Sequence, residues 1–332
     1  MLALLASSSQ GFTRRFPNLA TATCRAGVVA CVSEQPQLEA DAQALLDEAD
    51  GDAMKARASY IGYTMAYLED AEPTLYAALK SDPTREDCHA AIVEITWDAI
   101  AAFLPVTHSP VPTPAAQKKL AAIARAGCDG VNLSPATLDV GCGNGLLLPF
   151  LAACGAPPEK YRGIDLSGRM IQVAQAALER KVAAEPTYAG ASFDELSFKE
   201  LVTEAEQGGA RYDAIYFNAA LQFLKLEETL AAAAKLLAPG LASRLVLSHL
   251  NGAAFVRKER EESATTVIST MPSLAELEAA AEPLGLQVAI PSFLGSEPAE
   301  IEAAMEDFYL VILRWDAAHG GVDGETGLSD TP

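Results

Sequence analysis

Basic side chains are scarce in this 332-residue chain, in which 24 Lys and Arg face 44 Asp and Glu. The formal net charge of −20 excludes the broad cationic surface that nucleic acids and anionic membranes require. We therefore expect neither a nucleic acid nor a membrane as a partner. A local basic pocket remains compatible with this balance.

Long uninterrupted hydrophobic runs are also missing. Two stretches without charged residues, 99–117 and 140–157, are long enough to raise the question of a membrane span. The first contains four prolines and the second four glycines, so neither pattern predicts a spanning helix.

Metal-binding and disulfide patterns are absent as well. The six cysteines include no C-x-x-C pair, and the four histidines are scattered along the chain. Zinc sites and disulfide frameworks both need closer or more regular spacing. We expect no metal site and a reducing compartment.

Acidic residues are missing from the first 33 positions, which carry three arginines and many Ser, Thr and Ala residues. This composition is typical of an organelle transit peptide. The segment Val29-Ala30-Cys31 resembles the cleavage region of green-algal plastid transit peptides. The chloroplast is therefore the expected destination, with the mitochondrion as the alternative. An N-terminus of chance composition is the plainer interpretation.

Residues 34–112 have the pattern of a helical cap followed by a linker. Apolar residues recur at helical spacing between 37 and 104 and predict helices over 37–49, 53–68 and 84–104. The stretch 108–114 contains three prolines and predicts a stiff linker. A larger domain is expected over 113–315 and a flexible tail over 316–332.

The larger domain alternates strand and helix patterns, which predicts a doubly wound parallel α/β sheet with helices on both faces. The last two strands follow one another with only a loop expected between them, so one of them could be antiparallel. The strands are expected over 136–140, 161–164, 188–193, 214–217, 244–248, 286–290 and 308–314.

A glycine-rich turn follows the first of these strands, with the sequence Asp139-Val-Gly-Cys-Gly-Asn-Gly145. Glycine permits a sharp turn and lets a ligand approach the main chain closely. In an open α/β sheet, such a turn lies at the edge where ligands bind. Asp165 follows Gly145 by twenty residues, at the end of the next strand, where an acid can accept both hydroxyls of a ribose.

Two ligand classes compete for this turn. The dinucleotide fingerprint G-x-G-x-x-G needs a glycine at position 146, where this chain has Leu146. The spacing D-x-G-x-G-x-G resembles instead motif I of the class I S-adenosylmethionine-dependent methyltransferases. Segments 161–170, 212–224 and 236–248 are similar to further parts of that family. The resemblance covers about residues 115–315, is nearest to small-molecule members of methyltransferase types 11 and 12, and extends to a plant and algal plastid-type branch.

The resemblance implies S-adenosylmethionine as cofactor and a Rossmann-like seven-stranded sheet of order 3-2-1-4-5-7-6, with strand seven antiparallel. Family members often read the adenine with an Asp after strand three, but Ser192 occupies that place, so Asp194 is the first candidate and Glu195 the second. The residues implied in cofactor binding are Asp139, Gly141, Cys142, Gly143, Asn144, Gly145, Asp165, Leu166, Met170, Asp194 and Asn218.

Catalytic candidates come from two places. His249 follows strand five, where acceptors bind in the family, and is a candidate general base. Tyr60 and Tyr63 share one face of a cap helix and are candidates for closing and lining an acceptor pocket. A satisfied buried histidine and ordinary core packing are the plainer interpretations of these residues, and Asn218 can be a strand-end turn residue.

The expected function is transfer of a methyl group from S-adenosylmethionine to a small-molecule acceptor by in-line displacement. Such a reaction asks the protein mainly to position the reactants and exclude water. The alternatives are an NAD-dependent oxidoreductase and a non-catalytic methyltransferase-like partner protein.

Overall fold

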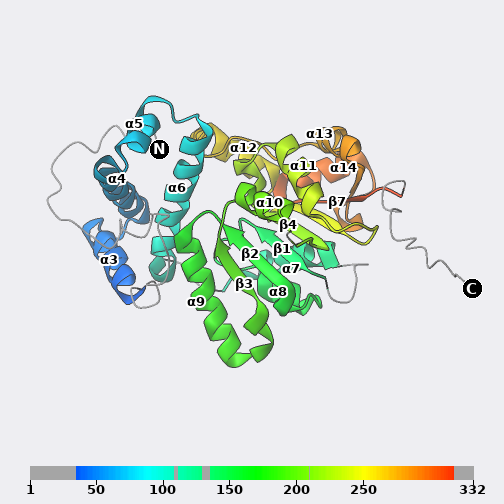
Figure 1. Cartoon of the computed structure of the whole chain (residues 1–332), viewed down its shortest axis with the longest axis horizontal. Coiled ribbons are helices and arrows are strands. Elements are labelled where there is room, and N and C mark those ends of the chain that lie inside the picture. Colours follow the sequence, from blue (N-terminus) through cyan, green and yellow to red (C-terminus); the bar gives the residue numbers. More distant parts are fainter. Residues whose placement is uncertain (1–34, 108–110, 129–134, 209, 318–332) are drawn as a thin grey trace, which may run out of the picture.

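The computed structural model describes residues 35–107, 111–128, 135–208 and 210–317 (Figure 1). The expected transit peptide over 1–33 lies outside these residues, as does the expected tail beyond residue 317. Within the described ranges, no helix is both long enough and apolar enough to cross a lipid bilayer.

The N-terminal part is a helical cap with a hydrophobic core of its own. Its helices are α3 (Gln35–Glu48), α4 (Ala53–Ala71), α5 (Pro73–Ser81) and α6 (Glu86–Thr107). The core includes the buried side chains of Leu45, Tyr60, Ile92 and Phe103. The sequence patterns predicted three of these helices but not α5, which begins at a proline, a residue suited to the first turn of a helix.

The main domain is a seven-stranded sheet of order β3-β2-β1-β4-β5-β7-β6. Strand β7 runs antiparallel to both β5 and β6, while the other pairs are parallel. The expected fold and strand order are thus confirmed. The strands are β1 (Thr137–Val140), β2 (Tyr161–Asp165), β3 (Ser192–Glu195), β4 (Ala214–Asn218), β5 (Arg244–His249), β6 (Leu286–Ala289) and β7 (Tyr309–Trp315).

Helices cover both faces of this sheet, because the strand residues are apolar on both sides. Helices α10, α11 and α13 pack on one face, and α7, α8 and α9 pack on the other. The helices of the main domain are α7 (Pro114–Cys128), α8 (Leu148–Ala153), α9 (Gly168–Ala184), α10 (Phe198–Glu206), α11 (Leu226–Leu236), α12 (Gly252–Glu262), α13 (Leu274–Ala281) and α14 (Pro298–Asp307).

Two expectations about these elements are wrong. The strand expected over 188–193 is instead a 3-10 helix over Pro186–Gly190, followed by β3. Pro186 starts this tight turn, and Gly190 lies so close to Glu159 that an added Cβ would meet its Cα at 2.6 Å. The last two strands are joined through helix α14 rather than through a loop alone.

Helix α6 connects the two parts of the molecule. Figure 1 shows it between the other cap helices and the sheet, beside the start of α9. Its inner side belongs to the cap core, while its neighbour in the main domain is α9. The cap therefore approaches the edge at which β1, β2 and β4 end, which is the ligand-binding edge of an open α/β sheet.

Candidate functional site

The glycine turn after β1 has left-handed backbone at all three glycines, with φ values of +67° at Gly141, +54° at Gly143 and +74° at Gly145. A Cβ added at Gly141 would lie 2.7 Å from the Cβ of Ala220, and one added at Gly145 would lie 2.6 Å from the ring of Phe193. At Gly143 it would meet nothing within 4 Å. Two glycines thus permit close packing, and Gly143 faces open space.

Asp165 closes the turn from the neighbouring strand. One of its carboxylate oxygens accepts a hydrogen bond from the backbone N–H of Gly143, and the other accepts one from that of Ser167, both at 2.9 Å. Burial raises the pKa of Asp165 to about 6, against the lowering effect of these hydrogen bonds. Each carboxylate oxygen retains a lone pair, so the group can also accept bonds from ligand hydroxyls.

Asp139 lies within β1, next to the turn, and is 1% exposed. Its Oδ2 accepts a hydrogen bond from the hydroxyl of Tyr161 at 2.9 Å. Its Oδ1 is buried and has no hydrogen-bond partner among the described residues. Burial raises the pKa of Asp139 to about 7. A buried oxygen without a donor is costly, so this position suits a ligand that brings a cation or a donor.

The other residues expected near the turn are in place around it. Cys142 is buried within the turn, and burial raises the pKa of its thiol, which therefore stays protonated. Asn144 and Leu166 are partly buried. Met170 is buried in the first turn of α9, where its N–H donates to the Ser167 hydroxyl at 3.0 Å.

Asp194 has a charged neighbour of its own. Its carboxylate accepts a hydrogen bond from Nε of Arg162 at 2.7 Å, in a half-exposed ion pair. Recognition of an adenine by Asp194 would compete with this pair and stays a prediction. Glu195, the next residue, lies opposite Asp165 in the parallel register of β2 and β3 and is therefore closer to the edge.

The end of β4 carries a strained residue. Ala219 has a φ of +56°, in the left-handed region that residues with a side chain rarely adopt. Before it, Asn218 accepts a hydrogen bond from the Ser248 hydroxyl at 3.1 Å. After it, Ala220 packs against Gly141. Asn218 thus ties β4 to β5 at the edge, which agrees with a turn role and leaves its cofactor role a prediction.

Gln222 was not expected from the sequence. It is 2% exposed, and its Nε2 donates to the carbonyl of Ala219 at 3.1 Å, which fixes the orientation of the amide. Its Oε1 is buried without a hydrogen-bond partner among the described residues. The sequence signal that could have identified Gln222 is its position as the single amide side chain in the apolar segment 219–224, directly after a strand.

His249 ends β5 and is 4% exposed. Its Nδ1 accepts a hydrogen bond from the backbone N–H of Asn251 at 3.3 Å, which leaves the ring proton on Nε2. The ring stacks on that of Phe255, with centroids 5.6 Å apart. Burial, together with the charge of Lys119, lowers the pKa of His249 to about 4. These features favour a satisfied buried histidine over a strong general base.

The two tyrosine candidates lie in the cap. Tyr60 is fully buried in the cap core, in edge-to-face contact with Phe103 at 6.5 Å, and burial raises its pKa. The guanidinium of Arg169 lies over its ring at 5.3 Å. Tyr63 is partly buried against the same core. Core packing therefore accounts for Tyr60, while a lid role for Tyr63 stays a prediction.

Several side chains of helix α6 contact the main domain. Asp98, 1% exposed, accepts hydrogen bonds from the Ser167 hydroxyl at 2.6 Å and the Arg169 N–H at 3.3 Å. Trp97 lies edge-on to Phe223, after β4, with centroids 5.9 Å apart. His89 contacts the Thr266 carbonyl at 3.0 Å through Nε2. The cap thus reaches segments that follow β2, β4 and α12.

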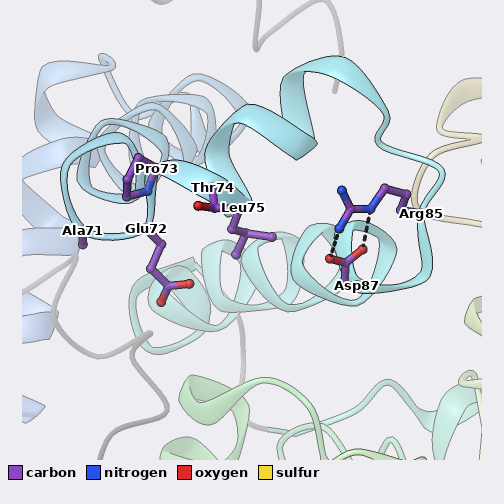
Figure 2. A pocket seen from close by; sticks show the side chains of 7 residues that line it. All are labelled: Ala71, Glu72, Pro73, Thr74, Leu75, Arg85 and Asp87. Carbon is purple, nitrogen blue, oxygen red and sulfur yellow. Dashed lines mark hydrogen bonds and ion pairs between the residues drawn. The ribbon is translucent and has the colours of Figure 1, made fainter.

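Two surface hollows lie away from the glycine turn. The first has a volume of about 520 Å³ and lies in the cap, where Arg85 and Asp87 on one side are bonded to one another (Figure 2). The second, of about 540 Å³, lies between the start of α11, helix α12 and helix α13. Neither is lined by a residue of the glycine turn. The first is lined by Ala71, Glu72, Pro73, Thr74, Leu75, Arg85 and Asp87.

Metal ligands do not gather anywhere in the described ranges, where no three His, Cys, Asp or Glu side chains could hold an ion together. The cysteines at 88, 128, 142 and 154 are free thiols.

Comparison with known proteins finds a matching family model for part of the chain. A model described as a methyltransferase domain matches residues 138–240, which include the glycine turn, Asp165 and the strained end of β4. No curated protein sequence matches the chain.

Several solved structures are similar in shape. Magnesium protoporphyrin IX methyltransferase from Synechocystis PCC 6803, with bound S-adenosylhomocysteine, is 18% identical over 69% of this chain and 100% of its own, with a TM-score of 0.47. The N-methyltransferase NodS from Bradyrhizobium japonicum WM9 is 18% identical over 60% and 87%, with a TM-score of 0.42. An O-methyltransferase family protein from Burkholderia thailandensis is 16% identical over 77% and 72%, with a TM-score of 0.46. Because these identities and TM-scores are low, the topology of the sheet is assigned from the strand pairing of this structure alone.

Proposed function

We propose that the protein transfers a methyl group from S-adenosylmethionine to a small-molecule acceptor, because residues 138–240 match a methyltransferase domain model. The observation that carries the proposal is the glycine turn, in which Gly143 faces open space and its backbone N–H is bonded to Asp165 on the neighbouring strand.

The residues around the turn suit this cofactor. Asp165 offers lone pairs to the two ribose hydroxyls, and the bare backbone at Gly143 leaves room for the methionine end. The unpartnered Oδ1 of Asp139 is available to an ammonium group or to a water that bridges to one. An NAD cofactor would bring a pyrophosphate, and two buried carboxyl groups beside the turn disfavour such an anion.

S-adenosylmethionine, when bound, supplies an electrophilic methyl group on a sulfonium. The work of this chain is to orient the reactants and to keep water away. Helix α6 serves the second task, since Trp97 and Asp98 contact the segments after β4 and β2. The neutral His249 is a weak base, so the site suits an acceptor that already carries a reactive lone pair or loses its proton readily.

Gln222 is the residue best suited to orient an acceptor by a hydrogen bond. Its buried Oε1 needs a donor, which an acceptor hydroxyl or amine would bring. It lies in the turn after β4, two residues beyond the alanine that packs on Gly141.

A two-stage experiment tests the proposal. Calorimetric titration of the purified full chain with S-adenosylhomocysteine and with NAD should show binding of the first and none of the second. The chain is then incubated with methyl-labelled S-adenosylmethionine and a metabolite extract, and labelled small molecules are identified by mass spectrometry. An Asp165→Ala variant serves as the control that should produce less label at sub-saturating cofactor. Binding of NAD alone would refute the cofactor, and cofactor binding without any labelled product would favour a non-catalytic partner protein.

We also propose that residues 1–33 direct the protein to the chloroplast, on the strength of their three arginines and lack of acids. Fusion of this segment to a fluorescent protein tests the destination. Mitochondrial fluorescence would support the alternative, and cytosolic fluorescence would refute an organelle leader.

A further inference from the structure

A chain of hydrogen bonds leads from the cap to the glycine turn. It starts at Asp98 on α6, which accepts a bond from the Ser167 hydroxyl at 2.6 Å. The backbone N–H of Ser167 donates to Asp165 at 2.9 Å, and the other oxygen of Asp165 accepts from the N–H of Gly143 at 2.9 Å. Three hydrogen bonds thus join a cap side chain to the open backbone of the turn.

We propose that Asp98 is a positioning residue that couples docking of the cap to the formation of the cofactor site, by holding Ser167 and the start of α9 in the geometry that orients Asp165. The inference rests on the proposed function, because it assigns to Asp165 a role in holding the cofactor.

Asp98 is buried, so its contact with the start of α9 is stable only when the cap is docked on the main domain. A carboxylate that is 1% exposed carries a large desolvation cost unless donors replace its water. The donors present are the Ser167 hydroxyl and the N–H of Arg169, both at the start of α9. No other position of the cap would satisfy this carboxylate with the same two donors, so α6 is held in one register on α9.

A second pair of side chains adds to the same junction. Arg169 is 3% exposed, and its guanidinium lies over the ring of Tyr60, which belongs to the cap core. Separation of the cap would therefore release Asp98 and Arg169 into water together. A junction of buried polar side chains from both parts of the molecule favours a docked cap over a partly separated one, because partial separation would leave these groups without partners and without full hydration.

Ser167 transmits the state of this junction to Asp165. It is the N-cap of α9, since its hydroxyl accepts from the N–H of Met170 at 3.0 Å while donating to Asp98. With Asp98 absent, the hydroxyl loses its acceptor and the loop 165–167 loses one of the bonds that fix it. The Asp165 carboxylate then samples more orientations, so the orientation that accepts hydrogen bonds from the ribose hydroxyls is less populated.

Coupling of this kind works in both directions. If the docked cap strengthens cofactor binding, the bound cofactor must strengthen docking of the cap by the same factor. The cofactor should therefore protect the backbone amides of α4 and α6, although neither helix contributes to the glycine turn.

The test compares Asp98→Ala and Asp98→Asn with Glu86→Gln in the full chain. Glu86 is a matched control, because it also lies on α6 and pairs with the main domain through Lys199 at 2.7 Å, but the pair is exposed. Exposed pairs contribute little. Each protein is titrated with S-adenosylhomocysteine by calorimetry, and hydrogen exchange of α4 and α6 is followed with and without this ligand.

We expect Asp98→Ala to bind S-adenosylhomocysteine about tenfold more weakly, which corresponds to about 1.4 kcal/mol. The ligand should slow exchange in α4 and α6 of the parent and of Glu86→Gln, but not of Asp98→Ala. Asp98→Asn should recover most of the affinity, because its amide oxygen still accepts from Ser167 and Arg169. If Asp98 had a purely structural role, Asp98→Ala would lower the stability of the protein with and without ligand, and the ligand would not change the exchange of the parent cap.

Equal affinities of parent and Asp98→Ala, or unchanged exchange of the parent cap on adding ligand, would overturn the coupling. If Asp98→Ala does not fold, Ser167→Ala takes its place, because it removes the hydroxyl that donates to Asp98. Weaker binding and reduced protection in Ser167→Ala but not in Glu86→Gln support the coupling, and identical behaviour of these two variants refutes it. A parent that binds no S-adenosylhomocysteine refutes the proposed function itself, and the coupling with it.

Discussion

Substitution of Gly143 by alanine separates ligand binding from folding more sharply than any other change in the turn. The added Cβ would meet nothing within 4 Å, whereas one on Gly141 or Gly145 would collide with Ala220 or Phe193. The Gly143→Ala protein should therefore fold, with a single methyl group standing in the space assigned to the cofactor.

The expected cost to folding is small. An L-residue at a φ of +54° is disfavoured by about 1–2 kcal/mol relative to glycine. Intrusion of one methyl group into a filled site costs typically about 1–3 kcal/mol. The affinity for S-adenosylhomocysteine should accordingly fall between about fivefold and about a hundredfold. Gly143→Val should lower it further, because a branched side chain fills more of the space and is less tolerant of this backbone.

Gly51→Ala is the matched control. Gly51 also has a left-handed backbone, with a φ of +79° and nothing within 4 Å of an added Cβ, but it lies between α3 and α4. Urea unfolding should show similar small losses of stability in both variants, and calorimetry should show lost affinity only in Gly143→Ala. Parent-like affinity in Gly143→Ala would mean that the ligand does not approach this backbone, and the assignment of the turn would fall.

Three further outcomes can be measured. Asp165→Ala should weaken S-adenosylhomocysteine binding at least about tenfold, since hydrogen bonds to a charged group contribute about 1.5–3 kcal/mol each; unchanged affinity would leave Asp165 with only a structural role at the start of α9. The rise in melting temperature caused by this ligand should grow from pH 5 to pH 8, because Asp165 and Asp139 have pKa values raised to about 6 and about 7, so their ionised forms appear only over this interval. The same shifts make the ligand-free protein lose stability as the pH rises from 3.8, the ordinary Asp pKa, to about 7. A ligand effect that is flat with pH would contradict the assignment. Ala219→Gly should raise the free energy of unfolding by about 1 kcal/mol by relieving a φ of +56°, and urea unfolding that shows a loss would contradict the inferred strain.

The part of the site that lies within one short segment could be predicted from the sequence. The three glycines and Asp139 adjoin a strand, and their spacing alone excludes the dinucleotide pattern. Asp165 was found because consecutive parallel strands end at one edge, so an acid at the end of the next strand lies beside the turn. The doubly wound sheet followed from the alternation of strand and helix patterns, and its strand order followed from the family resemblance.

What could not be predicted depends on contacts between distant segments. Asp98 and Ser167 are 69 residues apart, and no local pattern says where a helix of the cap meets the domain. The available signal was one acid within an otherwise apolar part of α6. The two interpretations of Tyr60 could not be separated for the same reason, since its helical face could line a pocket or fill the cap core, and the packing shows the second.

Short helices were missed although their signals were present. The segment from Ser197 to Glu200 forms a capping box at the start of α10, and Pro298 opens α14. The strand was expected to begin at Tyr188, but the proline before this residue and the glycine after it belong to a 3-10 helix.

The junction between α6 and the main domain also bears on how the chain folds as it is synthesised. The cap helices leave the ribosome before the surfaces that receive them. His89 meets Thr266 across 177 residues, which at about 5–20 residues per second takes about 9 to 35 s to make. Asp98 stays hydrated at least until Ser167, 69 residues further along, has been made, and the side of α6 that meets Thr266 stays uncovered for the whole interval. The cap therefore completes its contacts last although it is made first. Contacts between residues so far apart in the sequence slow folding. The uncovered side of α6 in the nascent chain is therefore a surface that a chaperone would shield.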